Sequence, residues 1–196
     1  LKRIELSYDE HFNAIKDAND DDFIMLSDND EIPNLDSEDF KKNKNDIVIF
    51  NQLFFYFKFN LLYEKMLWPG TKGCRKKNLK SFSWLRNIKF KKYPSWRIDT
   101  YFSNTKYSNL NIINNGGWHF TNLKSPEDMF EKFMNFGHHD EFRLSGITVE
   151  KIRDKISKRE MFYDHFADKS SKNKWDSDYK LKKIDTDLLP RYLVSN

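Results

Sequence analysis

Residues 23–33 read FIMLSDNDEIP, a short apolar run that leads directly into a cluster of carboxylates. A continuous apolar run of this length, bounded by acidic turns, is typical of a central parallel strand that is buried on both faces. Before it, Tyr8, Phe12 and Ile15 have helical spacing, so we expect an amphipathic helix over residues 7–18. Helix, acidic turn and buried strand in this order favour an α/β fold.

The rest of the chain adds further strands and helices to this start. Residues 46–60 are rich in β-branched and aromatic side chains and predict a long strand, and residues 112–113 begin a short one. Ser125 is placed to cap a helix that Gly137 would end, and Thr148 is placed to cap the next helix. We therefore expect strands alternating with helices rather than a helical bundle.

No internal repeat and no separate second domain are visible, so residues 1–196 are expected to form a single domain. Residues 69–92 combine Pro69, Gly70 and Gly73 with many lysines and arginines, and we expect a long basic loop there. Residues 167–187 are charged, poor in apolar side chains and expected to be mobile. The chain does not begin with methionine, and we expect the N-terminal part of the domain to be missing.

Composition excludes several classes of protein. Aromatic residues make up 16% and charged residues 33% of the chain, which is typical of a globular rather than a disordered protein. No apolar run approaches the roughly 20 residues that span a bilayer. The single cysteine, Cys74, excludes an internal disulfide and a cysteine zinc site.

Charge is distributed unevenly along the chain. Residues 1–45 hold 13 acidic against 6 basic side chains, whereas residues 58–92 hold 11 basic against one acidic. This dipolar pattern suits a metal pocket beside a phosphate-binding surface.

The carboxylates Asp28, Asp30 and Glu31 form the strongest candidate site. Ligands of open α/β sheets bind beyond the carboxyl ends of the strands, and these residues follow a predicted strand directly. Carboxylates this close repel one another unless a cation lies between them, and hard oxygen ligands suit Mg²⁺ or Mn²⁺. The acidic run 20–22 is interpreted as a solvated turn. The spacing lacks the later ligands of a calcium-binding EF-hand.

Two later segments contain residue types that suit a sugar-binding site. Gly116 and Gly117 would let the backbone approach a ligand closely, and Trp118 beside them would stack on a sugar ring. His119 is a candidate for binding a metal or a hydroxyl group, and core packing is the alternative for both rings. Residues 136–141, FGHHDE, contain two histidines and two carboxylates. This segment either supplies a general base or is simply a polar loop that follows a helix.

Together these segments resemble glycosyltransferase family 17, the β-1,4-mannosyl-glycoprotein 4-β-N-acetylglucosaminyltransferase-like family. The family pattern D-D-x-I-x-x-x-D-x-D-E-I-P is matched over residues 21–33, and its G-G-W-H segment over residues 116–119. Lys132, residues 135–141 and the late residues 189–192 match its further motifs more loosely. The family's upstream strand–helix units, which hold the nucleotide base, have no counterpart in these residues.

The resemblance implies an α/β fold with a GT-A-like, Rossmann-related mixed sheet flanked by helices, here without its N-terminal strand–helix units. It implies an inverting transfer of GlcNAc from UDP-GlcNAc to a glycan hydroxyl, with Asp28 and Asp30 holding Mn²⁺ or Mg²⁺ and the diphosphate. The substrate-binding residues that it implies are Glu31, Gly117, Trp118 and His138. The catalytic residues that it implies are His119 and a carboxylate base, for which Asp140 and Glu141 are both candidates.

Two other functions remain open at the level of sequence. One is a truncated, non-catalytic carbohydrate-binding remnant. The other is a metal-dependent nuclease that uses the acidic cluster for catalysis and the basic stretch for phosphates, although no nucleic-acid motif occurs and no nucleic-acid partner is expected. The expected location is the cytoplasm if the protein is a bacterial or viral enzyme, and the Golgi lumen if it is an animal protein. The sequence indicates no oligomeric state.

Overall fold

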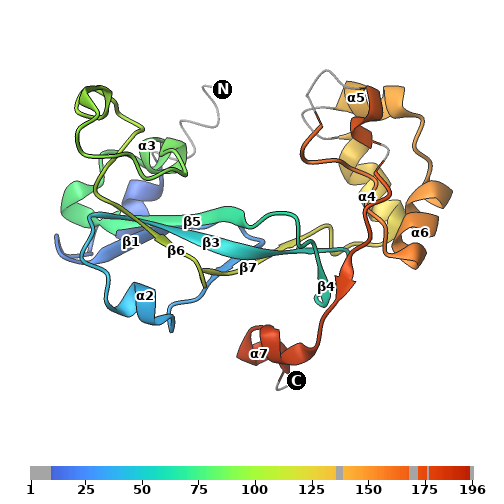
Figure 1. Cartoon of the computed structure of the whole chain (residues 1–196), viewed down its shortest axis with the longest axis horizontal. Coiled ribbons are helices and arrows are strands. Elements are labelled where there is room, and N and C mark those ends of the chain that lie inside the picture. Colours follow the sequence, from blue (N-terminus) through green and yellow to red (C-terminus); the bar gives the residue numbers. More distant parts are fainter. Residues whose placement is uncertain (1–9, 136–138, 168–171, 176, 195–196) are drawn as a thin grey trace. The chain divides into compact units, whose positions relative to one another are not determined.

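The computed structural model describes residues 10–135, 139–167, 172–175 and 177–194, and the protein is a mixed α/β structure (Figure 1). The chain divides into two compact units. The first unit consists of Leu1–Leu53 and Leu67–His119, and the second consists of Phe54–Met66 and Phe120–Asn196. No helix among the described residues is both long enough and apolar enough to cross a membrane.

The first unit contains most of the strands. Its strands are β1 (Phe23–Leu26), β2 (Glu31–Pro33), β5 (Trp68–Arg75), β6 (Leu110–Ile113) and the first parts of β3 (Ile47–Tyr56) and β7 (Gly117–Thr121). Its α-helices are α2 (Glu38–Lys41) and α3 (Phe82–Asn87), and its 3-10 helices are η1 (Glu10–Ile15), η2 (Lys76–Asn78) and η3 (Ile98–Thr100).

The sheet of the first unit is mixed. β5 lies between β1 and β3 and is antiparallel to both, whereas β6 pairs with β3 in parallel. β2 pairs antiparallel with β7, so that Glu31 lies opposite His119. Because β5 is antiparallel to β1, its first residues lie at the carboxyl end of β1. The start of β5 is thereby brought to the acidic turn that follows β1.

The core of the first unit follows from the alternation of side chains along β3. One face packs under α3 in a buried cluster of Ile47, Ile49, Cys74, Leu85, Ile88 and Leu110. The opposite face forms a cluster of Val48, Phe50 and Ile113, against which Phe40 of α2 packs. Figure 1 shows α3 and α2 on opposite sides of these strands. The sheet is therefore covered on both faces, as expected for an α/β fold.

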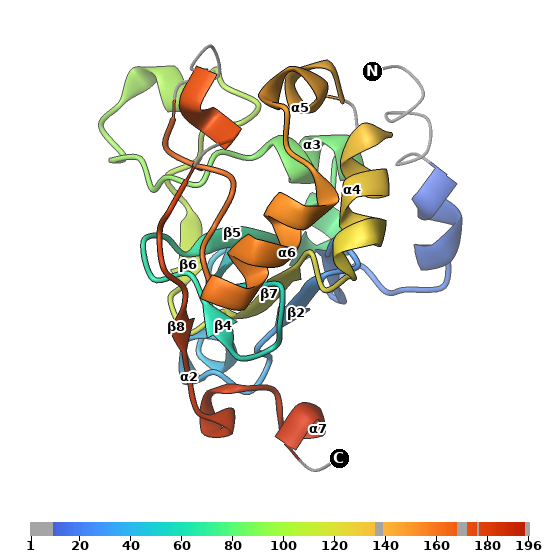
Figure 2. The ribbon, with the colours of Figure 1, turned by 90° about the vertical axis from the view of Figure 1, so that its right-hand side faces the viewer.

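The second unit is mainly helical. It contains the end of β3, β4 (Leu61–Leu62), the end of β7, α4 (Pro126–Met134), α5 (His139–Ser145), α6 (Val149–Lys158), η4 (Lys172–Trp175), β8 (Lys182–Lys183), η5 (Thr186–Leu188) and α7 (Arg191–Val194). α4 and α6 lie side by side (Figure 2). Each begins at a side-chain cap, because Ser125 Oγ accepts from Asp128 N–H at 3.1 Å and Thr148 Oγ1 accepts from Lys151 N–H at 3.3 Å.

Aromatic rings fill the core of the second unit. Phe142 packs against Phe133 and Trp175 with ring centroids 5.3 and 5.1 Å apart, and Phe133 also contacts Phe162. Such edge and tilted ring contacts add to the area that the rings remove from water. Three buried hydrophobic residues among the described part of the charged segment 167–187, namely Trp175, Leu181 and Ile184, belong to structured parts of this unit.

Several local predictions are confirmed. The long strand, the strand at residues 112–113 and the two capped helices occur as β3, β6, α4 and α6. The mixed sheet with helices on its faces is also confirmed. The predicted end of α4 at Gly137 lies outside the described residues.

Three predictions are wrong. The run 23–26 forms β1, which pairs antiparallel with β5 and buries only Ile24, so it is not a central parallel strand. The expected helix over residues 7–18 is a 3-10 helix over Glu10–Ile15 in its described part. Residues 69–92 are not a loop, because they contain most of β5 together with η2 and α3.

Candidate functional site

The acidic turn connects β1 to β2 in the first unit. Asp28 C=O accepts from Glu31 N–H at 3.1 Å, which closes a four-residue turn. In the reverse direction, Asp28 N–H donates to Glu31 Oε2 at 3.2 Å. These two bonds hold the turn in one conformation and fix the direction in which its carboxylates point.

The Asp28 carboxylate is bound by an arginine of α3. Arg86 donates from Nη1 to Oδ1 at 2.7 Å and from Nη2 to Oδ2 at 3.2 Å. This bidentate geometry matches the planar guanidinium to the planar carboxylate. Bidentate arginine–carboxylate pairs are among the stronger ion pairs in proteins. Both side chains are more than 40% exposed, so the pair is open to exchange with a ligand.

The Glu31 carboxylate is more deeply buried than that of Asp28. Trp68 Nε1–H, at the start of β5, donates to Glu31 Oε1 at 2.9 Å. Burial raises the pKa of Glu31, while the hydrogen bonds from Trp68 and from the Asp28 backbone oppose the rise and the charges of Asp28 and Asp30 add to it. The site therefore holds a carboxylate whose negative charge is costly in the absence of a cation.

Trp68 also stacks on His119, which comes from β7. The two ring centroids lie 4.5 Å apart with an interplanar angle of 15°. His119 is 5% exposed, and its Nδ1 lies 3.7 Å from Asp30 Oδ1. That distance fits an ionic contact when the imidazole is protonated but is too long for a hydrogen bond. The pair of rings thus forms a flat, rigid wall beside the acidic turn.

A buried polar pair from β3 and β5 lies under this wall. Gln52 is fully buried, and its Nε2–H donates to Thr71 Oγ1 at 3.3 Å. The hydroxyls of Thr71 and Ser27 are hydrogen-bonded to each other. The Gln52 Oε1 atom has no hydrogen-bond partner among the described residues. It lies directly over Gly70, where a Cβ atom would come within 2.0 Å of it, so only glycine leaves this acceptor its space.

These side chains surround a pocket of about 170 Å³. Asp28, Glu31 and Trp68 line it together with the cationic Lys72 and Arg86. Small-molecule sites commonly have volumes of about 300–1,000 Å³. The pocket is therefore large enough for a phosphate group or a hydrated cation but not for a whole nucleotide. Its lining offers both signs of charge to such a ligand.

Lys72 anchors the pocket to the end of α3. Its Nζ donates to the backbone carbonyls of Arg86 and Ile88, the latter at 2.7 Å. The pKa of Lys72 is lowered to about 8, chiefly by burial and then by the nearby charges of Arg86 and Lys89, whereas the charge of Glu31 opposes the change. A cation at the end of a helix satisfies its last carbonyls and interacts well with the helix dipole.

Replacing Lys72 by methionine is expected to remove part of the rise in stability with pH. The folded pKa is about 8 and the unfolded value is 10.5, so the folded protein binds fewer protons between these values and its free energy of unfolding increases as the pH is raised through them. Allowing for the partial exposure of Lys72, this rise should shrink by roughly 1–2 kcal/mol in Lys72→Met. Urea unfolding at about pH 7 and about pH 10 measures the change. The exposed Lys44→Met is the control, and an equal loss of slope in both variants would contradict the assignment.

The donor set of the acidic turn suits a hard divalent cation. Among the described residues no three His, Cys, Asp or Glu side chains converge on one point. Mg²⁺, however, usually keeps several waters and takes only one or two carboxylates together with substrate phosphates. Asp28 and Asp30 are two such carboxylates on one turn, and the buried Gln52 Oε1 is a further oxygen beside Glu31. Asp28 and Asp30 are therefore the residues that would hold such a cation, and Arg86 binds both oxygens of Asp28 in this structure.

The predicted site residues fall in both units. The first unit brings His119, which is distant in sequence, to the neighbouring residues Asp28, Asp30 and Glu31 of the acidic turn. Trp118 does not join them, because consecutive residues of β7 point to opposite faces and His119 faces Trp68. Gly117 pairs with Pro33 in the β2–β7 ladder and so shapes the site through its backbone.

The remaining predicted residues belong to the second unit. Glu141 Oε2 accepts from the buried Lys174 Nζ at 2.7 Å, and Asp140 Oδ1 lies 3.3 Å from His139 Nε2. His138 lies outside the described residues. The assignment of the catalytic base to Asp140 or Glu141 stays a prediction.

Trp68, Lys72, Arg86 and Gln52 are the site residues that sequence reasoning misses. Gln52 lies in the predicted β-prone run 46–60, Lys72 and Arg86 lie in the predicted basic loop 69–92, and Trp68 directly precedes that loop. The only local signal is the Trp-Pro-Gly start of β5, which places an aromatic ring next to two residues typical of turns. Their convergence depends on the antiparallel pairing of β5 with β1 and β3.

Comparison with protein-family models, with curated proteins and with solved structures gives no match to this chain.

Proposed function

We propose that the protein is a metal-dependent inverting glycosyltransferase and that the pocket beside the acidic turn binds the diphosphate of a nucleotide-sugar donor. The observation that carries the proposal is the meeting of Asp28 and Glu31 with Lys72 and Arg86 around one small pocket, beside the stacked rings of Trp68 and His119. The order of the acidic motif and the Gly-Gly-Trp-His motif in the sequence, resembling glycosyltransferase family 17, supports it.

Each group of the pocket has a role in this proposal. A bound Mn²⁺ or Mg²⁺ would neutralise charge on the departing nucleoside diphosphate. Asp28 and Asp30 would ligate that cation, and Arg86 would turn from Asp28 to a phosphate oxygen. Lys72, held at the end of α3, would add a fixed positive charge. The flat wall of Trp68 and His119 would carry the sugar by stacking.

The donor is proposed to be UDP-GlcNAc and the acceptor a glycan hydroxyl. The pocket itself argues only for the phosphates, because its charged lining suits phosphate oxygens and its volume of about 170 Å³ is smaller than that of most small-molecule sites. An inverting transfer further needs a carboxylate that takes the proton of the acceptor hydroxyl. Asp140 and Glu141 are the proposed candidates for that base.

The direct test is release of UDP from UDP-GlcNAc by the purified full chain with Mn²⁺, followed by ion-pair chromatography. We expect hydrolysis without an acceptor and faster release with a glycan mixture, both abolished by EDTA and restored by added Mn²⁺. A panel of other nucleotide-sugars identifies the donor. Absence of turnover with every member of the panel would overturn the proposed activity.

The Asp28–Arg86 ion pair favours a second candidate, a non-catalytic carbohydrate-binding domain. In such a domain the pair would simply hold α3 to the acidic turn, with no metal involved. Binding of glycans to the full chain without Mn²⁺ and without turnover would support this candidate. Cleavage of DNA in the same buffers, with no activity on nucleotide-sugars, would instead favour a nuclease.

A further inference from the structure

The second unit contains a separate, strongly cationic pocket. Its volume is about 640 Å³, and its wall comes from the β3–β4 turn, the start of α4, the last turns of α6 and β8. Five of the side chains that line it are cationic, namely Lys58, Lys124, Arg153, Arg159 and Lys183, and none of the described residues lining it is acidic. Cations from four different segments of the chain therefore meet around one hollow.

Most of these cations have no ion-pair partner among the described residues. Arg153 is paired with Glu127, whereas Lys58, Lys124 and Lys183 occur in none of the ion pairs or side-chain hydrogen bonds of the described chain, and the same is true of the Arg159 side chain. Like charges brought together without counter-charges destabilise a fold. These four side chains are exposed, so solvent screens much of this repulsion, and a bound anion would neutralise the positive charge that remains.

Two lysines that neighbour the pocket residues in sequence are paired with carboxylates, unlike the lysines that line the pocket. Lys182 donates to Glu64 at 2.8 Å, and Lys158 donates to Asp154 at 2.7 Å. In β8, Lys183 pairs with Leu61, which lines the pocket, and Lys182 pairs with Leu62. Because neighbouring residues of a strand point to opposite faces, Lys183 faces the pocket and Lys182 faces away from it.

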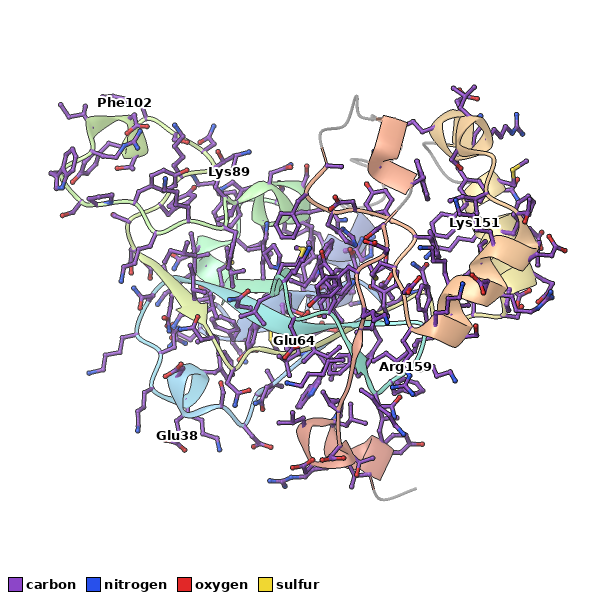
Figure 3. The ribbon with its side chains drawn as sticks, turned by 45° about the vertical axis from the view of Figure 1, so that its right-hand side comes forward. Glu38, Glu64, Lys89, Phe102, Lys151 and Arg159 are labelled. Atoms are coloured by element: carbon purple, nitrogen blue, oxygen red, sulfur yellow. The ribbon has the colours of Figure 1, made fainter. Side chains whose placement is uncertain are left out.

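The backbone around the pocket is strained. The non-glycine residues with positive φ among the described residues are Phe57, Asn122 and Arg159, at 65°, 55° and 58°. Phe57 and Arg159 line the pocket, and Asn122 lies two residues before Lys124. Arg159 occupies the position after α6 where glycine is the usual residue. Figure 3 shows Arg159 at the end of α6 and Lys151 nearer its other end.

A strained backbone conformation of this kind is retained where the side chain at that position has a function, such as binding a ligand. At the end of α6, an arginine in place of glycine adds a guanidinium to the pocket at a conformational cost. Apolar atoms of Phe57, Leu61 and Ile156 line the same hollow, and its volume lies within the usual range of about 300–1,000 Å³ for small-molecule sites. The lining thus suits a ligand with an apolar part and more than one negative charge.

We infer that this pocket binds a phosphate-bearing small molecule, with Lys58, Lys124, Arg159 and Lys183 as the groups that contact its phosphates. Lysine supplies compact positive charges and arginine a planar fork of donors, and both match phosphate oxygens. The inference stands apart from the proposed transferase activity, because none of the residues of this pocket belongs to the acidic site of the first unit.

The test is a calorimetric titration of the full chain with inorganic pyrophosphate in the absence of divalent metal. In the double variant Lys124→Gln/Lys183→Gln, the affinity should fall by about tenfold or more, as expected for loss of two charge-assisted contacts. The matched control Lys158→Gln/Lys182→Gln removes the same net charge and should change the affinity by less than about twofold. An equal loss in both double variants, or no binding of pyrophosphate by the unaltered chain, would overturn the inference.

Arg159→Gly separates binding from folding. Glycine relieves the positive φ of 58°, so the melting temperature should rise by about 2–4 °C while the affinity for pyrophosphate falls. A fall in both quantities would show that Arg159 acts structurally and would count against the site. A parallel titration with vesicles of phosphatidylglycerol distinguishes a lipid phosphate from a soluble one. A site for a soluble ligand binds pyrophosphate at least as tightly as it binds the vesicles, whereas a lipid site binds the vesicles more tightly.

Discussion

Replacing Asp30 by alanine is expected to reduce donor turnover by at least about 100-fold, because a metal ligand that stabilises the leaving diphosphate contributes several kcal/mol to the transition state. Asp30 is the carboxylate of the acidic turn that contacts His119 rather than an arginine, so its loss leaves the Asp28–Arg86 pair in place. The full chain should therefore remain folded. Release of UDP in the presence of Mn²⁺ measures the change.

Asp20→Ala is the matched control for this experiment. Asp20 is an exposed carboxylate in the acidic turn that precedes β1, and only its backbone carbonyl accepts a hydrogen bond, from Lys77 N–H, in the described chain. Its replacement should leave turnover within about twofold of the unaltered protein, as for most exposed positions. Equal activity of Asp30→Ala and Asp20→Ala would remove the acidic turn from the proposed metal site.

Replacing Gly117 by alanine is expected to destabilise the first unit by about 3 kcal/mol or more. Gly117 has a φ of +112°, and a Cβ atom there would lie 2.1 Å from the carbonyl oxygen of Ile32 and 2.7 Å from the amide nitrogen of Asn34. Both are backbone atoms of the segment that pairs with β7, so relief requires a shift of β2 itself. Denaturant unfolding followed by tryptophan fluorescence measures the loss.

Gly146→Ala controls for the backbone conformation alone. Gly146 also has a positive φ, of +66°, but a Cβ atom there meets nothing within 4 Å. Its replacement should cost about 1 kcal/mol, the usual penalty for an L residue in this region. The difference between the two variants isolates the backbone collision at Gly117. A similar small loss in both would mean that β2 moves away easily.

The local elements were predictable because their signals lie within a few residues. Ser125 and Thr148 are capping residues next to amphipathic segments, and α4 and α6 begin where they predict. The nearly continuous run of large side chains along β3 likewise reflects burial on both faces. These features need no partner from elsewhere in the chain to be recognised.

The wrong predictions concern partners rather than elements. An apolar run such as residues 23–26 carries no information on the direction of its neighbour, and β1 pairs antiparallel with β5. The glycines and lysines of β5 suggested a loop, yet Gly70 and Gly73 are where Gln52 and Phe23 approach the strand too closely for any Cβ atom. Tertiary pairing overrides intrinsic propensity at such positions.

The same distinction holds for the candidate site. The carboxylates Asp28, Asp30 and Glu31 are evident from the chain alone, because their spacing and the strand before them are local. Their counter-charges are not, since Lys72 and Arg86 reach them only through the antiparallel register of β5 and the helix that follows it. Residues that are near one another in sequence thus specify where the carboxylates collect. Long-range strand pairing decides which cations and which aromatic rings face those carboxylates, because the neighbours of a strand are set by packing over the whole sheet.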